Sequence, residues 1–265
     1  ADQGFLLPRG GSVDTSLALE ETGSSVPQTQ VTVTKIEKAG PVWRLHGEDG
    51  QVLTADIVVL AAGIGTADLL ETEDCPELRP NRGQVELVGA DVAPTLPEES
   101  IAYGGYVTAT TDGFRTIGST FDRMEAVSED DYEPSTEDRS RILSMLDDVV
   151  GVKIAEDVVE RSWAGVRATT ADHLPFAGPV PKGGEARAQY APLAKDAKLG
   201  GLGLPPLHDG LYMLAGLGSK GYQYGPILGD YLAAMICGDP LPLPDNLIAP
   251  LHPLRDLVRT LKRSK

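Results

Sequence analysis

The sequence lacks the residues on which several classes of protein depend. Its 265 residues contain only two cysteines, Cys75 and Cys237, which lie far apart and outside any paired motif. This excludes a disulfide framework and a cysteine-based zinc site, and we expect no metal. The longest apolar run, residues 57–62, is much shorter than the about 18 residues typical of a membrane helix. No charged segment with a cleavage site opens the chain, so we expect a cytoplasmic protein without a membrane partner.

Basic residues are also scarce. The chain has 23 Lys and Arg against 39 Asp and Glu, a net charge of −16. Such a field repels nucleic acid unless cations gather locally. They gather in residues 251–265, at Arg255, Arg259, Lys262, Arg263 and Lys265. This basic tail fits either a solvated helix end or a contact surface for an anionic partner.

The spacing of apolar residues predicts a sheet that the chain leaves and later rejoins. Residues 31–36 and 42–46 alternate apolar and polar side chains like half-buried strands, whereas residues 57–62 are continuously apolar, as in a strand buried on both faces. Residues 211–215 have the same buried character and lead through a glycine loop into a helix with Pro226 in its first turn.

Between these parts the sequence predicts a different layer. Short strands at residues 83–88, 101–109 and 114–118 favour an antiparallel sheet. Apolar residues between 142 and 150 recur at helical spacing after Ser135, a predicted N-cap, so one helix should pack on this sheet. Residues 182–207, rich in Gly, Pro and Ala, are expected to form a long loop.

The expected fold class is therefore α/β plus α+β, a partial Rossmann-like domain interrupted by an antiparallel-sheet domain. The predicted boundaries are residues 1–77 for the first part of the Rossmann-like domain, 78–175 for the antiparallel-sheet or substrate domain, 176–240 for the second part, and 241–265 for the basic C-terminal tail.

The segment Gly216-Leu-Gly218-Ser-Lys-Gly221 matches the G-x-G-x-x-G dinucleotide pattern between a strand and a helix. The residues after it contain no second strand that ends in a ribose-binding acid, so this loop cannot found a complete dinucleotide unit. The helix N-terminus still presents free N–H groups and about half a positive charge, to which Lys220 adds a full charge. The loop therefore fits an anion or a site where negative charge develops, with a plain tight turn as the alternative.

Arg167 lies between small residues just after an expected strand at residues 158–163. Its planar guanidinium group would pair bidentately with a carboxylate in a cleft. A surface salt bridge is the alternative role for this residue.

The spacing G-x-R-x-x-T-x-D-x-x-P-x-x-G from Gly165 to Gly178, together with the glycine loop before a final helix, resembles the D-amino-acid-oxidase-like flavoproteins, glycine oxidase included. Further segments resemble one branch, the FAD-dependent oxidoreductase domain of the bifunctional tRNA 5-methylaminomethyl-2-thiouridine biosynthesis proteins. These segments are residues 8–11, 60–63, 79–84, 118–122, 190–193, 210–221, 236–242 and 251–253.

This resemblance implies FAD as the cofactor and makes the Rossmann-like part the FAD-binding domain. The residues expected to contact FAD are Gly10, Gly11, Gly63, Gly216, Gly218, Ser219, Lys220 and Gly221. Arg167 would bind the substrate carboxylate and would carry catalysis with Lys220 and Tyr106. Arg82 and Gln84 would line the substrate pocket beside Tyr106. The superfamily opens with a unit that binds the FAD pyrophosphate, and we expect this chain to begin after that unit.

The implied reaction is the oxidation of an N-substituted glycine, the carboxymethylaminomethyl group of a tRNA wobble uridine, by hydride transfer to flavin and hydrolysis of the imine. The basic tail would then contact tRNA. Two alternatives stay open. One is a glycine-oxidase-type enzyme that acts on a free amino acid or amine, which the acidity of the chain favours. The other is a folded, truncated substrate domain that holds no cofactor.

Overall fold

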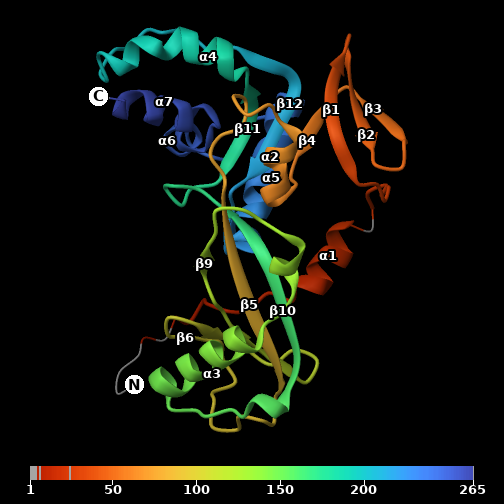
Figure 1. Cartoon of the computed structure of the whole chain (residues 1–265), viewed down its shortest axis with the longest axis vertical. Helices are drawn as coiled ribbons and strands as arrows, with labels where there is room; N and C mark the ends of the chain where they lie inside the picture. Colours follow the sequence, from red (N-terminus) through yellow and green to blue (C-terminus); the bar gives the residue numbers. More distant parts are fainter. Residues whose placement is uncertain (1–4, 6, 24, 265) are drawn as a thin grey trace. The chain divides into compact units, whose positions relative to one another are not determined.

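The computed structural model describes residues 5, 7–23 and 25–264 (Figure 1). The chain divides into two compact units, which we describe separately. Unit 1 consists of Ala1–Pro27 and Pro80–Val166, and unit 2 of Gln28–Arg79 and Arg167–Lys265. The predicted domain boundaries after residues 77, 175 and 240 stay predictions.

Unit 1 is an antiparallel sheet with one helix packed across it (Figure 1). The strand order is β10-β5-β8-β7-β6, and β9 also pairs with β5. The strands are β5 (Arg79–Gly89), β6 (Ile101–Ala102), β7 (Tyr106–Val107), β8 (Phe114–Gly118), β9 (Asp122–Arg123) and β10 (Val159–Thr169). The helix α3 (Thr136–Val150) buries Ile142 and Leu146 against Val88, Val107 and Ile117 of the sheet.

The ends of α3 follow from its sequence. Ser135 is the N-cap, and its side chain accepts a hydrogen bond from the backbone N of Asp138 at 3.1 Å, as predicted. Gly151 ends the helix with φ of 76°, a left-handed conformation that glycine adopts at little cost. A complete reciprocal capping box lies instead at Ser128 and Asp131, on the short helix η2 (Glu129–Tyr132).

Residues 1–27 belong to unit 1, although the sequence placed them with the FAD-binding part. The hydroxyls of Ser12 and Ser100 form a hydrogen bond, and the backbone N of Ala109 lies 3.4 and 2.9 Å from these two oxygens. These contacts tie the start of the chain to the antiparallel sheet. The helix α1 (Thr15–Gly23), all of it described, buries none of its residues.

Unit 2 contains a sheet in the order β11-β12-β4 and a separate antiparallel sheet, β1-β2-β3. These strands are β1 (Val33–Ala39), β2 (Val42–Gly47), β3 (Val52–Ala55), β4 (Val58–Leu60), β11 (Phe176–Pro181) and β12 (Leu207–Ala215). Alternation along β12 supplies two cores: Leu211 and Met213 pack with Trp43, while Tyr212 and Leu214 pack on the helix side. The strand is therefore covered on both faces, as its continuous apolar character predicted.

Helices cover the rest of unit 2. After β4 come η1 (Gly63–Gly65) and α2 (Thr66–Leu69), and after β12 comes α5 (Gly221–Cys237). Leu228, Tyr231 and Leu232 of α5 pack against Ala177 of β11. Among the helices that the described residues form, none is long and apolar enough to cross a membrane.

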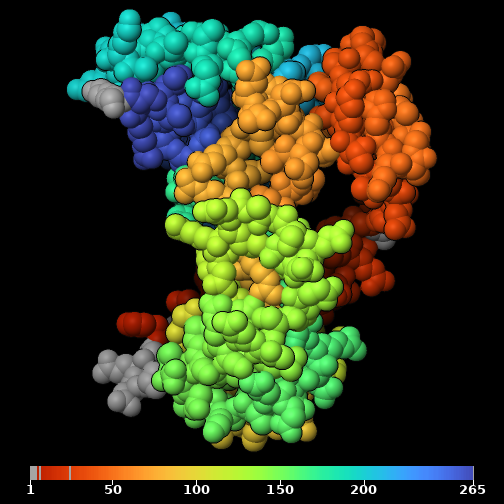
Figure 2. All heavy atoms as spheres, in the orientation of Figure 1, coloured from red at the N-terminus to blue at the C-terminus, as the bar shows by residue number. Residues whose placement is uncertain are grey.

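Two segments of unit 2 are more ordered than the sequence suggested. The expected loop 182–207 contains α4 (Gly183–Tyr190) and η4 (Ala191–Ala194). The expected basic tail folds into α6 (Asp245–Ile248), η5 (Ala249–Leu251) and α7 (Leu254–Arg263), with Leu254, Asp256 and Leu261 buried. The segment α4 lies against α7 in the space-filling view, cyan against blue (Figure 2).

Candidate active site

Two glycine loops leave the same edge of the sheet in unit 2. The strands β4 and β12 run parallel, with Leu60 opposite Met213. Their carboxyl ends therefore meet at one edge, where the chain continues through Gly63 in one loop and through Gly216 in the other. Ligand sites of open α/β sheets lie outside this edge.

The second loop requires glycine for two different reasons. Gly216 has φ of +73°, and a Cβ added there would lie 2.5 Å from Cγ2 of Thr170. Gly218 has φ of +57°, and its backbone N donates to the carbonyl oxygen of Ala168 at 2.9 Å. The backbone of the loop thus packs against the end of β10 and against Thr170, which follows it.

This hydrogen bond brings together the two motifs that the sequence singled out. Ala168 is the residue after Arg167, so the glycine loop and the backbone of Arg167 lie beside one another within unit 2. The Arg167 side chain is half-buried. Its role in binding a carboxylate stays a prediction.

The helix that follows the loop has a terminus open to an anion. The α5 helix begins at Gly221; its described first turn has no acidic residue, and no side chain caps it. Lys220 lies at the N-cap, with its Nζ 5.7 Å from the centre of the Tyr224 ring. Both Ser219 and Lys220 are exposed. The helix dipole and the Lys220 ammonium group therefore concentrate positive charge at this terminus.

The first loop also has features of a ligand site. Gly63 has φ of +59°, and no atom of the described residues lies within 4 Å of a Cβ built there. The hydroxyl of Thr66 is buried and has no hydrogen-bond partner among the described residues. An unsatisfied buried hydroxyl costs about 1–3 kcal/mol, so a bound polar group would stabilise it. The open glycine backbone, the buried hydroxyl and the uncapped helix fit a cofactor that carries hydrogen-bonding groups and gains negative charge.

Arg82 and Gln84 bind polar groups within unit 1. Arg82 donates to the carbonyl oxygens of Asp131 and Glu133 at 3.0 and 2.6 Å and forms an ion pair with Asp138. Gln84 is fully buried, and its amide bonds to Ser135 and Glu86. Both side chains lie on the face of β5 that α3 covers, so they hold this helix on the sheet. A role for them in lining a substrate pocket stays a prediction.

The other candidates of unit 1 lie on different parts of it. Tyr106 is on the face opposite α3, where its ring lies next to Gly118 and Val85, and 36% of the residue is exposed. Gly10 donates its backbone N to the carbonyl oxygen of Leu7 at 2.9 Å, in a turn well before α1. The roles proposed for Tyr106, Gly10 and Gly11 stay predictions.

The cations of the basic tail are partly used inside unit 2. Arg255 and Arg259 both form ion pairs with Asp172, and their side chains are only 13% and 20% exposed. Lys262 and Arg263 are exposed at the end of α7, and Lys265 lies outside the described residues. A contact surface for tRNA at this helix would therefore have fewer free cations than the sequence implied.

A comparison with known protein families identifies the family to which the chain belongs. Residues 17–235 match the model of the family described as FAD dependent oxidoreductase (DAO). The chain belongs to this family. FAD is thus the cofactor of the family, and the two glycine loops of unit 2 are the described elements that fit it.

The same comparison finds relatives of one kind. The chain is 32% identical over 271 residues to the tRNA 5-methylaminomethyl-2-thiouridine biosynthesis bifunctional protein of Aeromonas hydrophila, a match that covers 99% of this chain and 40% of that protein. It is 30% identical over 240 residues to the protein of the same name from Vibrio cholerae, covering 90% and 35%. The chain therefore spans well under half the length of these curated relatives.

Solved structures with a similar fold include two oxidases. Glycine oxidase from Geobacillus kaustophilus superimposes with a TM-score of 0.61 at 20% identity, over 84% of this chain and 51% of that one. Iminodiacetate oxidase from Chelativorans sp. BNC1 gives a TM-score of 0.58 at 19% identity, over 84% and 53%. These likenesses confirm the predicted fold class.

Proposed function

We propose that this chain oxidises an N-substituted glycine, the carboxymethylaminomethyl group of a tRNA wobble uridine, with FAD as its cofactor. The observation that carries the proposal is the hydrogen bond from Gly218 to Ala168, because it joins the glycine loop to the strand end that bears Arg167. The relatives named for tRNA modification support the substrate class, since the match covers almost the whole chain.

The residues that would hold the flavin are backbone groups of both loops. They are Gly63, Gly216, Gly218, Ser219, Lys220 and Gly221. FAD, when bound, supplies the acceptor for a hydride. Lys220 and the N-terminus of α5 would stabilise the negative charge that this acceptance creates.

Arg167 would anchor the carboxylate of the substrate and so fix the neighbouring methylene carbon in place. The amine must be neutral, because its lone pair forms the C=N bond as the hydride leaves that carbon. Water then adds to the carbon of this bond, which yields glyoxylate and the shortened aminomethyl base. This route demands no general acid or base from the protein, so positioning and electrostatics would carry catalysis.

The test is replacement of Arg167 by methionine in the FAD-loaded protein. Loss of a charge-assisted pair costs about 1.5–3 kcal/mol, so we expect kcat/KM for a carboxymethylamine substrate to fall about ten- to hundredfold. Flavin reduction is followed as loss of absorbance near about 450 nm in the absence of oxygen, a wavelength typical of oxidised flavin bound in such sites. Arg187→Met, which removes an exposed arginine from α4, is the matched control. Unchanged kinetics in Arg167→Met would remove this residue from the site.

A second function, oxidation of a free amino acid or amine without RNA, is favoured by two observations. The chain carries a net charge of −16, and the arginines nearest the start of α7 are occupied by Asp172. Binding of tRNA at two salt concentrations separates the two functions, because phosphate contacts give a steep salt dependence. If the chain binds no tRNA but oxidises free carboxymethylamines, the second function replaces the first.

A further inference from the structure

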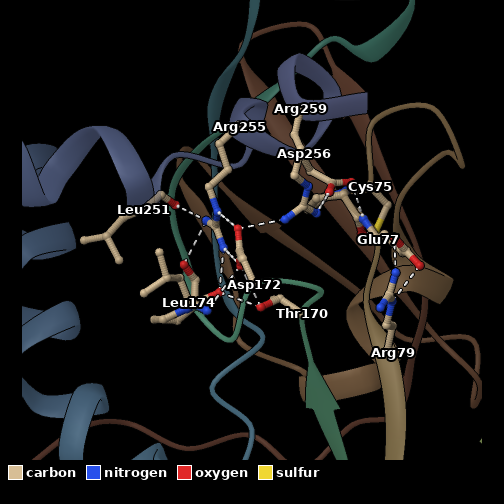
Figure 3. Close-up of polar contacts among 12 residues, drawn as sticks. Cys75, Glu77, Arg79, Thr170, Asp172, Leu174, Leu251, Arg255, Asp256 and Arg259 are labelled. Atoms are coloured by element: carbon tan, nitrogen blue, oxygen red, sulfur yellow. Dashed lines mark hydrogen bonds and ion pairs between the residues drawn. The ribbon is translucent and has the colours of Figure 1, made fainter. Parts of the chain in front are cut away.

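The turn between β10 and β11 is held by the C-terminal helix. Asp172, in that turn, accepts hydrogen bonds from Nε and Nη2 of Arg255, both at 3.1 Å, and from Nη1 of Arg259 at 2.8 Å (Figure 3). Arg255 also donates to the carbonyl oxygens of Leu174 at 2.5 Å and Pro175 at 3.0 Å. One guanidinium group therefore binds both the acid and the backbone of this turn.

The same network reaches two of the three residues that surround Gly216, the third being Leu78. The hydroxyl of Thr170 donates to Leu174 O at 2.8 Å and lies 3.1 Å from Oδ1 of Asp172, while its methyl group faces Gly216. Phe176 lies on another side of Gly216, 3.7 Å from a Cβ built there, and the guanidinium of Arg255 stacks over its ring at 3.9 Å. Thr170 and Phe176 therefore have contacts with the turn and with α7 as well as with the loop.

A further branch of the network holds the other segment that leads into the sheet of unit 1. Arg259 forms an ion pair with Asp256, and Oδ2 of Asp256 accepts the backbone N–H of Glu77 at 2.9 Å (Figure 3). Thr169 in turn donates to the carbonyl oxygen of Arg79 at 2.9 Å. The helix α7 thus binds both the turn after β10 and the segment just before β5.

We propose that Arg255 and Asp172 are positioning residues, and that through Thr170 and Phe176 they set the position of the glycine loop, Gly216–Gly221. This inference rests on the proposed function, which assigns flavin binding to the glycine loop. In this role Arg255 and Asp172 would contact neither the cofactor nor the substrate. They act by fixing the wall against which the loop backbone packs.

The chemistry of the pair suits this role. Burial opposes ionisation of Asp172, but the hydrogen bonds from Arg255 and from the N–H of Leu174 outweigh it and hold the pKa of this carboxyl well below its usual range. The carboxylate therefore stays charged at neutral pH. Since Arg255 is 13% exposed and Asp172 31%, the pair is screened less than a surface pair. A planar guanidinium that binds two acceptors fixes direction as well as distance.

The first readout is hydrogen exchange of the loop amides in the protein without added ligand. In Arg255→Met and Asp172→Asn we expect exchange at Gly216–Gly221 to accelerate about tenfold relative to the amides of β12, because local opening no longer breaks charge-assisted bonds. Arg255→Lys keeps the charge and should recover part of the protection. Arg187→Met on α4 should leave the loop unchanged. A rise shared equally by β12 and the loop would overturn the proposal, because it would show only a general loss of stability.

If Arg255→Met does not fold, the same hydrogen-exchange measurement is made on two variants of Thr170. Thr170→Val keeps the methyl that faces Gly216 and removes the hydroxyl, whereas Thr170→Ser does the reverse. We expect both to accelerate loop exchange, because the hydroxyl anchors the wall and the methyl forms it. Normal loop protection in both variants would overturn the relay through Thr170.

The second readout separates this inference from the proposed function. In FAD-loaded protein, Arg255→Lys should lower kcat several-fold while KM for a carboxymethylamine stays within about twofold, because the carboxylate anchor is untouched. A raised KM with normal kcat would contradict a positioning role for Arg255. That result would leave the carboxylate-binding role of Arg167 unaffected. Conversely, unchanged kinetics in Arg167→Met would refute that role but would not alter the interpretation of the hydrogen-exchange measurement.

Discussion

Gly216 is a position in the loop where the backbone conformation and the packing both require glycine. Its φ of +73° is a left-handed conformation, and an added Cβ would lie only 2.5 Å from the methyl carbon of Thr170. In Gly216→Ala the conformation costs about 1–2 kcal/mol and the overpacking about 1–3 kcal/mol. We therefore expect the free energy of unfolding of unit 2 to fall by about 2–5 kcal/mol.

The two contributions separate in a double-mutant cycle. Thr170→Ser removes the methyl group that the new Cβ meets, so it should recover the overpacking part in the double variant and leave the conformational part. Gly221→Ala is the control, since its φ is not positive and no described atom lies within 4 Å of the added carbon. As the first residue of α5, alanine there should be neutral or stabilise by up to about 1 kcal/mol.

The assay is urea unfolding followed by tryptophan fluorescence in a Trp163→Phe background. The remaining Trp43 is buried in the core of unit 2. A Gly216→Ala protein as stable as the parent would refute the loop geometry. Failure of Thr170→Ser to recover any stability would refute the contact between the methyl group and the loop, and with it the wall on which the positioning proposal depends.

Two further predictions concern titratable side chains. Burial, with Asp256 nearby, raises the pKa of the Cys75 thiol to about 11. Alkylation at neutral pH should therefore label the exposed Cys237 and leave Cys75 unmodified until the protein unfolds. Equal rates of alkylation at the two cysteines would contradict this prediction. Burial lowers the pKa of His252 from 6.5, and its Nδ1 accepts from the N of Leu254 at 3.0 Å. Because the folded pKa is the lower one, the stability of unit 2 should be full above about pH 7 and decline as pH falls through 6.5, and His252→Asn should flatten this decline in urea titrations.

Periodicity predicted the strands well because burial leaves a local signal. Residues 211–215 became the carboxyl half of β12, which is covered on two faces, and residues 58–60 of the apolar run became β4. The expectation that this run is buried on both faces was wrong for β4, because Ile57 and Val59 are 43% and 42% exposed. The N-cap at Ser135 was also readable, since a hydroxyl three residues before Asp138 is a local pattern. Such features depend on residues close together in the sequence.

The misses have long-range causes. Arg255 and Asp172 are 83 residues apart, so nothing local distinguished an internal ion pair from a solvated cation. Gln84 sits on a strand whose alternation shows that two faces exist but not which one the helix covers. The helix α4 has few apolar residues, and Gly183 at its start is required because the backbone of Glu73 occupies the space of a side chain. From the sequence alone, a glycine at such a position indicates a loop rather than the start of a helix.

The central claim is that the glycine loop and Arg167 form one site for flavin and carboxylate. It is tested most directly by adding a simple carboxylate that the protein does not oxidise, such as acetate, to the FAD-loaded protein and recording the visible flavin spectrum. The account predicts a saturable spectral change in the parent protein that is lost or greatly weakened in Arg167→Met. The same change with the same affinity in both proteins would contradict it, because the carboxylate would then bind beside the flavin without this arginine.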